Sequence, residues 1–171
     1  RDPIQPLGGA TVREAIENNL RQVQEQAEQA GREMLAHLNH PNFGWAVTAE
    51  DIAYAVTERH FEVYNGHPGV NQPGDEHRPS TDRLWDIPNT IPPARLDAPP
   101  LYGIATDDSH HYHQKGGSRP FRGWQMVRAT HLTPEHIIRA IKAGDSYATS
   151  GVTLADVRFD AGTKTQELAV G

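Results

Sequence analysis

The stretch Tyr102-Gly103-Ile104-Ala105-Thr106-Asp107-Asp108-Ser109-His110 sets the interpretation of this chain. It begins as a short apolar run and ends in two carboxylates, a hydroxyl and an imidazole. A strand that delivers such side chains at its carboxyl end is typical of the active sites of α/β barrels. Because Asp108 and His110 are two positions apart, an extended chain places their side chains on the same side. The pair is therefore predicted to supply two ligands to one metal ion.

Two carboxylates stand next to each other in this stretch. Asp107 and Asp108 repel each other unless a cation or a hydrogen-bond donor offsets their charge, and a metal ion is a natural compensator. The same run could instead cap a helix, since aspartate and serine both favour the N-cap position. The residues alone leave both interpretations open.

Polar side chains also follow two earlier strand candidates. His40 comes after one short apolar segment, and Glu62, Asn65 and His67 lie at the end of the next one. In a parallel sheet or barrel these ends face the same way, so the side chains are expected to meet in one pocket with Asp108. Nitrogen and carboxylate ligands without sulfur suit zinc, manganese or iron.

Each of these positions also has a plain structural explanation. A histidine followed by proline after a strand is commonly a surface turn, which is the alternative for His40. Glu62 could be an ordinary carboxylate at the rim of the sheet. His111 and His113 are expected to be solvated loop residues. Three polar groups at strand ends in one chain are stronger evidence than any one of them.

The clearest helix is predicted over Thr11–Ala30. Its apolar residues recur every three or four positions, Thr11 and Glu14 form a capping box, and Gly31 ends it. A coiled-coil arm is the alternative, but at this length a single amphipathic helix that covers a sheet is favoured.

The rest of the chain alternates helices and strands. Further helices are predicted after Thr48, with Ile52, Ala53 and Val56 on the buried face, and after Thr133, ending at Gly144. Short strands are predicted at 34–39, 61–64, 101–106, 124–129, 146–149 and 154–159. A proline-rich segment at 71–100 holds one short helix at 81–86, and a Gly/Arg loop spans 114–123. The alternation favours a parallel α/β fold.

Composition restricts the class of partner. With 171 residues and a net charge of −6, the chain has no basic stripe for nucleic acid. The chain has no cysteine and therefore no thiolate metal site or disulfide, and this leaves the cellular compartment open. No segment approaches the roughly 20 apolar residues of a membrane span. The first residue is Arg1, so we expect further sequence upstream.

Five motifs together resemble the C-terminal half of a PHP (polymerase and histidinol phosphatase) domain, and the nearest branch is that of the CehA/McbA-type metallohydrolases. The motifs are His40–Phe43, Phe61–Pro68, Ala105–His110, Arg122–Ala129 and Gly144–Val152. The similarity extends from about Thr11 to Leu154. Residues 1–155 are therefore expected to form this half-domain, and 156–171 a trailing strand segment or the start of a following region.

The resemblance implies the C-terminal part of a distorted (β/α)7 TIM-like barrel that holds two or three divalent metal ions. His40, Asp108 and His110 match metal ligands of the family. Glu62, Asn65 and His67 match a motif that lines the same pocket and are not assigned as ligands. Asp107 is expected to support or cap the site. The His-x-His of the family's first motif is absent, so the N-terminal half of the domain, or a second copy of this chain, is the expected partner.

The implied activity is metal-dependent hydrolysis of a small anionic molecule, with a phosphoester as the broadest expectation. A carbamate or other ester is the alternative substrate within the same fold. Arg122 is the predicted anion-binding residue. A different class of function, metal binding or protein interaction without turnover, follows if the ligand set stays incomplete.

Overall fold

The structure is a computed structural model that describes residues 5–90, 99–113, 116–160 and 165–170, with only the backbone given for 158–160 and 165–170. Part of the predicted proline-rich segment and two residues of the predicted Gly/Arg loop lie outside these ranges.

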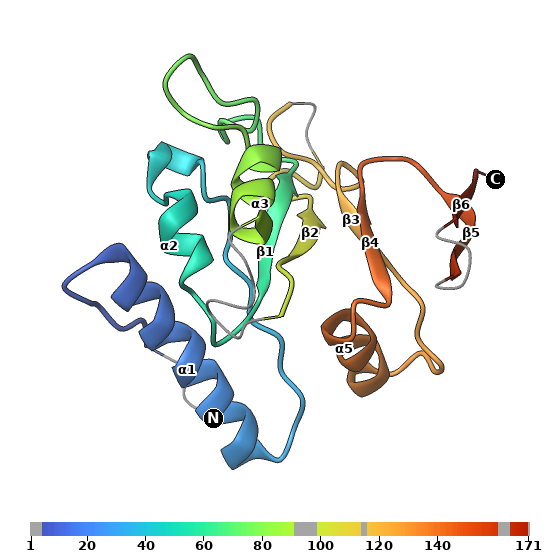
Figure 1. Ribbon diagram of the computed structural model, residues 1–171, viewed down its shortest axis with the longest axis horizontal. Coiled ribbons are helices and arrows are strands. Elements are labelled where there is room, and N and C mark those ends of the chain that lie inside the picture. The colour runs from blue at the N-terminus through green and yellow to red at the C-terminus, as the bar shows by residue number, and fades with distance from the viewer. Residues whose placement is uncertain (1–4, 91–98, 114–115, 161–164, 171) are drawn as a thin grey trace.

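Two parallel strands lie at the centre of the fold (Figure 1). Strand β1 (His60–Asn65) pairs with β2 (Tyr102–Thr106), and Leu38 adds a single parallel bridge to Phe61 on the other edge of β1. The parallel order agrees with the prediction for these segments. The strand predicted at 34–39 is reduced to that one bridge.

Helices α2 (Ala49–Ala53) and α3 (Thr81–Thr90) pack together and cover β1. Phe61 points into this layer and is fully buried, which stabilises the fold by about 2 kcal/mol relative to an exposed ring. The buried cluster consists of Ala49, Ile52, Phe61, Leu84 and Leu101. This core packs against β1, and β1 together with the turn after it carries three of the predicted site residues.

Helix α2 is shorter than its sequence pattern predicts. It begins at the predicted cap, where Thr48 and Asp51 form a capping box, but it ends at Ala53 and leaves Val56 exposed. The buried guanidinium of Arg59 explains this end, because its Nη1 lies 3.3 Å from the carbonyl oxygens of Ile52, Ala53 and Ala55. A cation at the carboxyl end of a helix satisfies carbonyls that have no partner within the helix.

Helix α1 (Val12–Ala30) matches its predicted range. Thr11 accepts a hydrogen bond from the Glu14 backbone, and Gly31 ends the helix in the left-handed conformation with a φ of 58°. The Glu14 carboxylate bonds the Ala10 backbone instead of the cap residue itself. Helix α1 contacts α2 and therefore lies on the same side of the sheet as α2 (Figure 1).

The C-terminal part contains two antiparallel pairs. Strand β3 (Trp124–Val127) leads through α5 (Pro134–Lys142) to β4 (Ser146–Thr149), and β3 and β4 pair antiparallel. The expectation of parallel pairing is therefore wrong for these two strands. Among the described residues, β2 and β3 are not paired through their backbones. The side chain of Gln125 on β3 bonds the backbone of β2 instead. Its amide lies 3.3 Å from the Ala105 nitrogen and 3.4 Å from the Gly103 oxygen.

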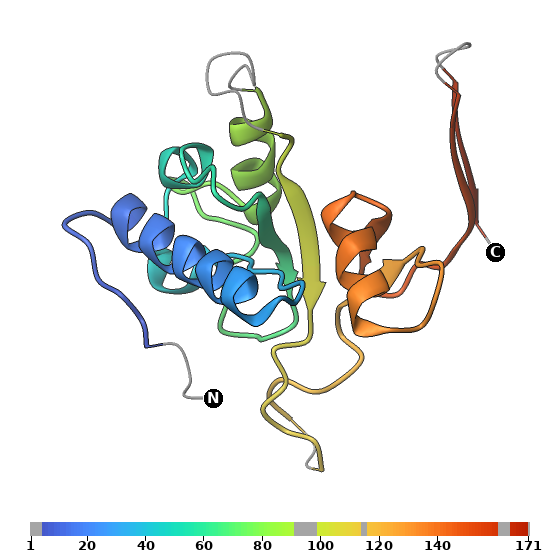
Figure 2. The ribbon, with the colours of Figure 1, turned by 90° about the horizontal axis from the view of Figure 1, so that it is seen from below.

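Strands β5 (Leu154–Asp160) and β6 (Thr165–Val170) form a hairpin that stands away from the remainder of the chain (Figure 2). The boundary predicted after residue 155 falls inside β5. The strands form three two-stranded sheets in the described parts of the chain, so the half-barrel of PHP type remains a prediction.

Candidate functional site

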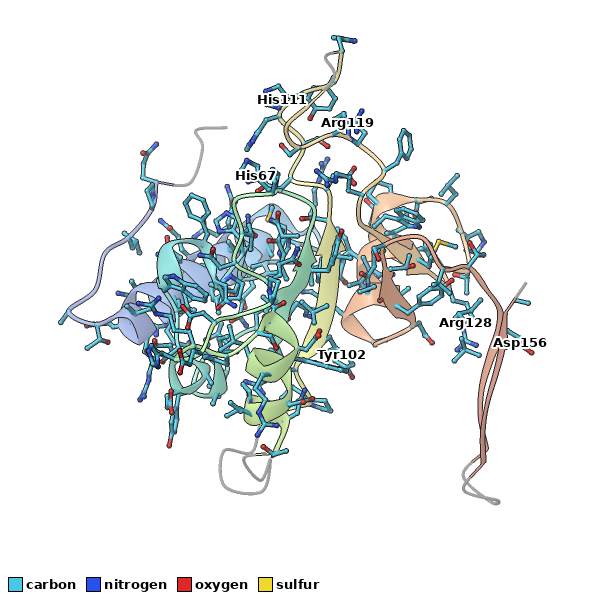
Figure 3. All side chains as sticks on the ribbon, turned by 90° about the horizontal axis from the view of Figure 1, so that it is seen from above. His67, Tyr102, His111, Arg119, Arg128 and Asp156 are labelled. Carbon is cyan, nitrogen blue, oxygen red and sulfur yellow. The ribbon has the colours of Figure 1, made fainter. Side chains whose placement is uncertain are left out.

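The carboxyl ends of β1 and β2 lie side by side because the two strands are parallel. Figure 3 shows His67 beyond the end of β1 and His111 and Arg119 on the loop that follows β2, at the end of the molecule opposite Tyr102. This is the end at which the sequence predicts a site. Contacts among Glu62, Asn65 and Asp108 connect the two strand ends.

A β-bulge in β1 brings Glu62 and Asn65 together. The pairing register with β2 shifts between Glu62 and Tyr64. Residues three apart on a regular strand point to opposite faces, and one extra residue restores them to the same face. The Asn65 Nδ2 atom consequently lies 2.8 Å from Oε2 of Glu62. The motif therefore depends on this irregularity.

Asn65 connects the two strands at their ends. Its Nδ2 donates to Oε2 of Glu62 and, at 3.2 Å, to Oδ2 of Asp108, while its Oδ1 accepts from the His67 backbone at 2.8 Å. Both amide protons face carboxylates, so the orientation of the amide is determined by its partners. The side chain is 2% exposed. Asn65 thus fixes Asp108 relative to β1.

Glu62 is a buried carboxylate, only 3% exposed, that accepts three hydrogen bonds. The donors are the His40 backbone at 2.6 Å, the Asn65 amide, and the Thr106 hydroxyl at 2.7 Å. A buried ionised carboxylate requires such donors. Glu62 therefore joins β1, β2 and the turn at His40, which is a positioning role and not that of an ordinary rim residue.

Asp108 and His110 are brought together as predicted, but by a different geometry. The distance from Asp108 Oδ1 to His110 Nε2 is 3.5 Å. Strand β2 ends at Thr106, and Asp108 has a left-handed φ of 46°, so the extended chain that the alternation argument requires is absent. No helix begins within residues 107–113, which removes the N-cap alternative.

The separation of this pair fits a shared metal ion. Two donor atoms that each lie about 2.1 Å from one tetrahedral ion are roughly 3.4 Å apart. The Asp108 side chain is 27% exposed and that of His110 is 61% exposed, so both are accessible from solvent. In the described part of the chain, however, no group of three or more histidine, aspartate or glutamate side chains is arranged to hold a metal ion. The residues therefore fit two positions of a coordination shell.

His40 lies at the edge of this network. Its backbone nitrogen bonds Glu62, and its φ of 26° is unusual for a residue other than glycine. The imidazole packs against Phe43 with ring centroids 5.3 Å apart. The contact of His40 with the other predicted residues is thus made through its backbone.

His67 lies beside the predicted ligand pair. Its ring meets that of His110 edge to face, with centroids 5.3 Å apart. The Gly69 backbone nitrogen donates to His67 Nδ1 at 3.0 Å. His67 therefore lies next to the predicted ligand pair, and the turn that follows β1 positions its ring.

Asp107 has a different role from Asp108. Its Oδ1 accepts hydrogen bonds from the backbone nitrogens of Arg122 at 2.6 Å and Gly123 at 2.9 Å. Burial raises the pKa of Asp107, but the N–H groups of Gly123, Arg122 and Phe121 outweigh it and hold the pKa below its usual value. Asp107 closes the base of the loop 107–123, in agreement with a supporting role.

Arg122 is exposed, and its Nη1 lies 3.3 Å from the Gly117 oxygen. The guanidinium retains other donors for an anion, so the predicted role is compatible with its position. On the same loop His111 and His113 are exposed, as expected of solvated residues.

Three residues that the sequence analysis did not identify hold the site in place. Gln72 bonds both the nitrogen and the oxygen of the Asn65 backbone, at 2.9 and 2.7 Å. Thr106 bonds Glu62, and the buried Ser118 accepts from the backbone of His110. Thr106 could have been recognised from the strand register, but Gln72 and Ser118 lie in loops whose path the sequence does not reveal.

A further histidine lies near the site. Burial lowers the pKa of His37; the charge of Glu62 opposes this shift and His60 adds to it. His37 Nδ1 and the Ser109 hydroxyl are buried without a hydrogen-bond partner among the described residues. The sequence analysis placed His37 inside a strand and assigned it no role.

Comparisons with protein-family models, with curated proteins and with solved structures found no match. In the described ranges of the chain, no helix is both long enough and apolar enough to cross a membrane.

Proposed function

We propose that this chain contributes part of the active site of a metal-dependent hydrolase. The observation that supports the proposal best is the 3.5 Å separation of Asp108 Oδ1 and His110 Nε2 at the end of a parallel strand. The hydrogen-bonded connection through Asn65 to Glu62 adds to it, because ligands in metal sites are commonly oriented by such outer partners.

The residues have distinct roles in this proposal. Asp108 and His110 bind the ion, Asn65 and Glu62 orient Asp108, and Arg122 attracts an anionic group of the substrate. A bound zinc, manganese or iron ion would supply an acidic water and polarise the substrate's phosphoryl or carbonyl oxygen. A phosphoester is the proposed substrate class, with a carbamate or other ester as the alternative. His40 is the third proposed ligand in this chain, and two or three ions would need further ligands from outside it.

A second candidate is a metal-binding or interaction domain without turnover. The absence of a third ligand in the described part of the chain favours it over a complete catalytic centre. The hydrolase, by contrast, needs the remaining ligands from an N-terminal half of the domain or from a second copy of the chain. Sequencing the gene upstream of Arg1 separates the candidates, because the hydrolase requires a His-x-His motif there.

Metal binding and hydrolysis are measured on the longest product of the gene. Zinc and manganese contents are determined by elemental analysis after dialysis, and activity is followed with p-nitrophenyl phosphate. Asp108→Ala and His110→Ala should each remove metal and lower activity by roughly 100-fold or more. His77→Ala is the matched control, since His77 is an exposed histidine whose backbone nitrogen bonds Asp75. Wild-type metal content and activity in the Asp108→Ala and His110→Ala variants would refute the proposal.

A further inference from the structure

We propose that His67 is a hydrogen-bond donor through its Nε2–H to an anionic oxygen of the substrate, and that it is not a metal ligand. The inference rests on the proposed function for the identity of the site. The tautomer of His67 follows from the turn geometry alone and can be tested without metal or substrate.

The turn after β1 fixes the imidazole. The Val70 nitrogen donates to the His67 oxygen at 3.2 Å, which closes a four-residue turn with Pro68 and Gly69 at its centre. Proline favours the second position of such a turn because its φ is already restricted. The Gly69 N–H then points at His67 Nδ1 at 3.0 Å. A backbone N–H always donates, so Nδ1 must accept and cannot carry a proton.

This contact decides the chemistry of the opposite ring nitrogen. In a neutral imidazole one nitrogen accepts and the other donates, so His67 carries its proton on Nε2. A metal ligand must offer a lone pair, and Nε2–H offers none. Glycine at position 69 permits this close approach, since a Cβ there would lie only 3.1 Å from both Nδ1 and Cε1 of His67. A ring flip that freed Nδ1 would leave the Gly69 N–H without this partner.

The position of the ring suits a donor to the substrate. His67 lies edge to face with His110, and its own backbone nitrogen is bound by Asn65, the residue that also orients Asp108. Donor and proposed ligands are thus attached to one hydrogen-bonded frame. A fixed donor beside the ions would stabilise the charge that develops on a phosphoryl or carbonyl oxygen during hydrolysis.

The tautomer is measured by long-range nitrogen–proton NMR correlations of the histidine rings in the full chain, without added metal. The His67→Ala spectrum assigns the resonances. We expect an unprotonated Nδ1 and a protonated Nε2 at neutral pH, and a shift of the Nε2 resonance on addition of inorganic phosphate to the metal-loaded protein. A protonated Nδ1 would overturn the inference and leave the proposed function intact.

Metal content separates the donor role from the ligand role. His67→Ala should retain the zinc or manganese of the wild type, as should His77→Ala, whereas His110→Ala should lose it. In a hydrolytically active protein, His67→Ala should lower kcat by roughly 100-fold with little change in KM, because one oxyanion donor is lost. His67→Gln, whose amide can donate, should recover part of the rate. Loss of metal from His67→Ala would overturn the inference even if no substrate is found.

Discussion

At the scale of single residues, the site depends on an amide placed between two carboxylates. The Asn65 amide donates one hydrogen bond to Glu62 and one to Asp108, and the residue is almost fully buried. Without such a donor the two acidic groups would repel each other at short range. The amide therefore keeps a negatively charged pair together before any cation is present.

Changing Asn65 to aspartate should reverse this effect. Asn65→Asp replaces the donor by a third carboxylate, so we expect the free energy of unfolding to fall by about 2 kcal/mol or more. Added zinc should restore part of this loss, because a cation offsets the new charge. Urea denaturation with and without zinc measures both effects. Asn39→Asp, an exposed residue, is the control and should change little.

The sequence predicted which residues take part in the candidate site better than it predicted how the backbone brings them together. Asp108 and His110 meet as expected, yet a turn at Asp108 brings them together and no extended chain does. Asn65 reaches Glu62 only because of a bulge, which single-sequence periodicity does not show. Gln72 acts across seven residues through a proline-rich loop, and its role depends on the path of that loop.

At the scale of secondary-structure elements, the start of β1 is joined to α5 by polar contacts. His60 Nδ1 lies 2.8 Å from Glu58 Oε1, and His60 Nε2 lies 3.2 Å from the Ile141 oxygen. Lys142 Nζ adds a cation 4.0 Å from Glu58 Oε2. These contacts attach α5 to the central strands at the end remote from the candidate site.

The Glu58 carboxylate should make this attachment sensitive to acid. Burial raises the pKa of Glu58, but hydrogen bonds from His60 and the Arg59 backbone, together with nearby positive charge, lower it overall from 4.5. A carboxylate with a lowered folded pKa stabilises the fold above its unfolded pKa, and this contribution is lost as pH falls through the folded value. Urea unfolding of wild type and Glu58→Gln should thus show a stability difference that shrinks below about pH 4.5.

The exposed Glu25→Gln variant is the control for that experiment, and its stability should remain parallel to that of the wild type. A difference between wild type and Glu58→Gln that stays constant from neutral to acid pH would contradict the role assigned to Glu58.

Elements with local start and stop signals were predicted well. Helix α1 and the caps at Thr48 and Thr133 follow from the chain itself, since capping is a contact between near neighbours. The early end of α2 was missed because it depends on Arg59, a residue outside the helix. Antiparallel pairing of β3 with β4 was missed because alternation of elements does not determine strand direction.

At the scale of the whole molecule, a side chain connects the parallel strands to the antiparallel pair of β3 and β4. Gln125 connects them, since its amide faces the β2 backbone and, at 2.9 Å, the Ser146 hydroxyl. The side chain takes the place that a neighbouring strand would occupy. Its two bonds to the β2 backbone, 3.3 and 3.4 Å long, are weak compared with those of a regular ladder.

Removing this amide should loosen one junction without unfolding the chain. Gln125→Ala is expected to lower the free energy of unfolding by about 1 kcal/mol and to speed hydrogen exchange at the Ala105 amide. Hydrogen exchange at the buried amides of β1 should change only as much as the global free energy of unfolding changes. Native-state exchange measures both, with Gln24→Ala on the exposed side of α1 as the control. Unchanged protection at Ala105 would show that the junction has another basis.

The left-handed backbone at His40 and Asp108 has a consequence for how this sequence can change. Each such conformation costs about 1 kcal/mol or more for a residue other than glycine. Selection for heat resistance alone would therefore favour glycine at these two positions, which removes the imidazole and the carboxylate. The substitutions that raise thermostability at these positions also remove the proposed functional side chains. Laboratory evolution for stability without an activity screen should therefore replace His40 and Asp108 early.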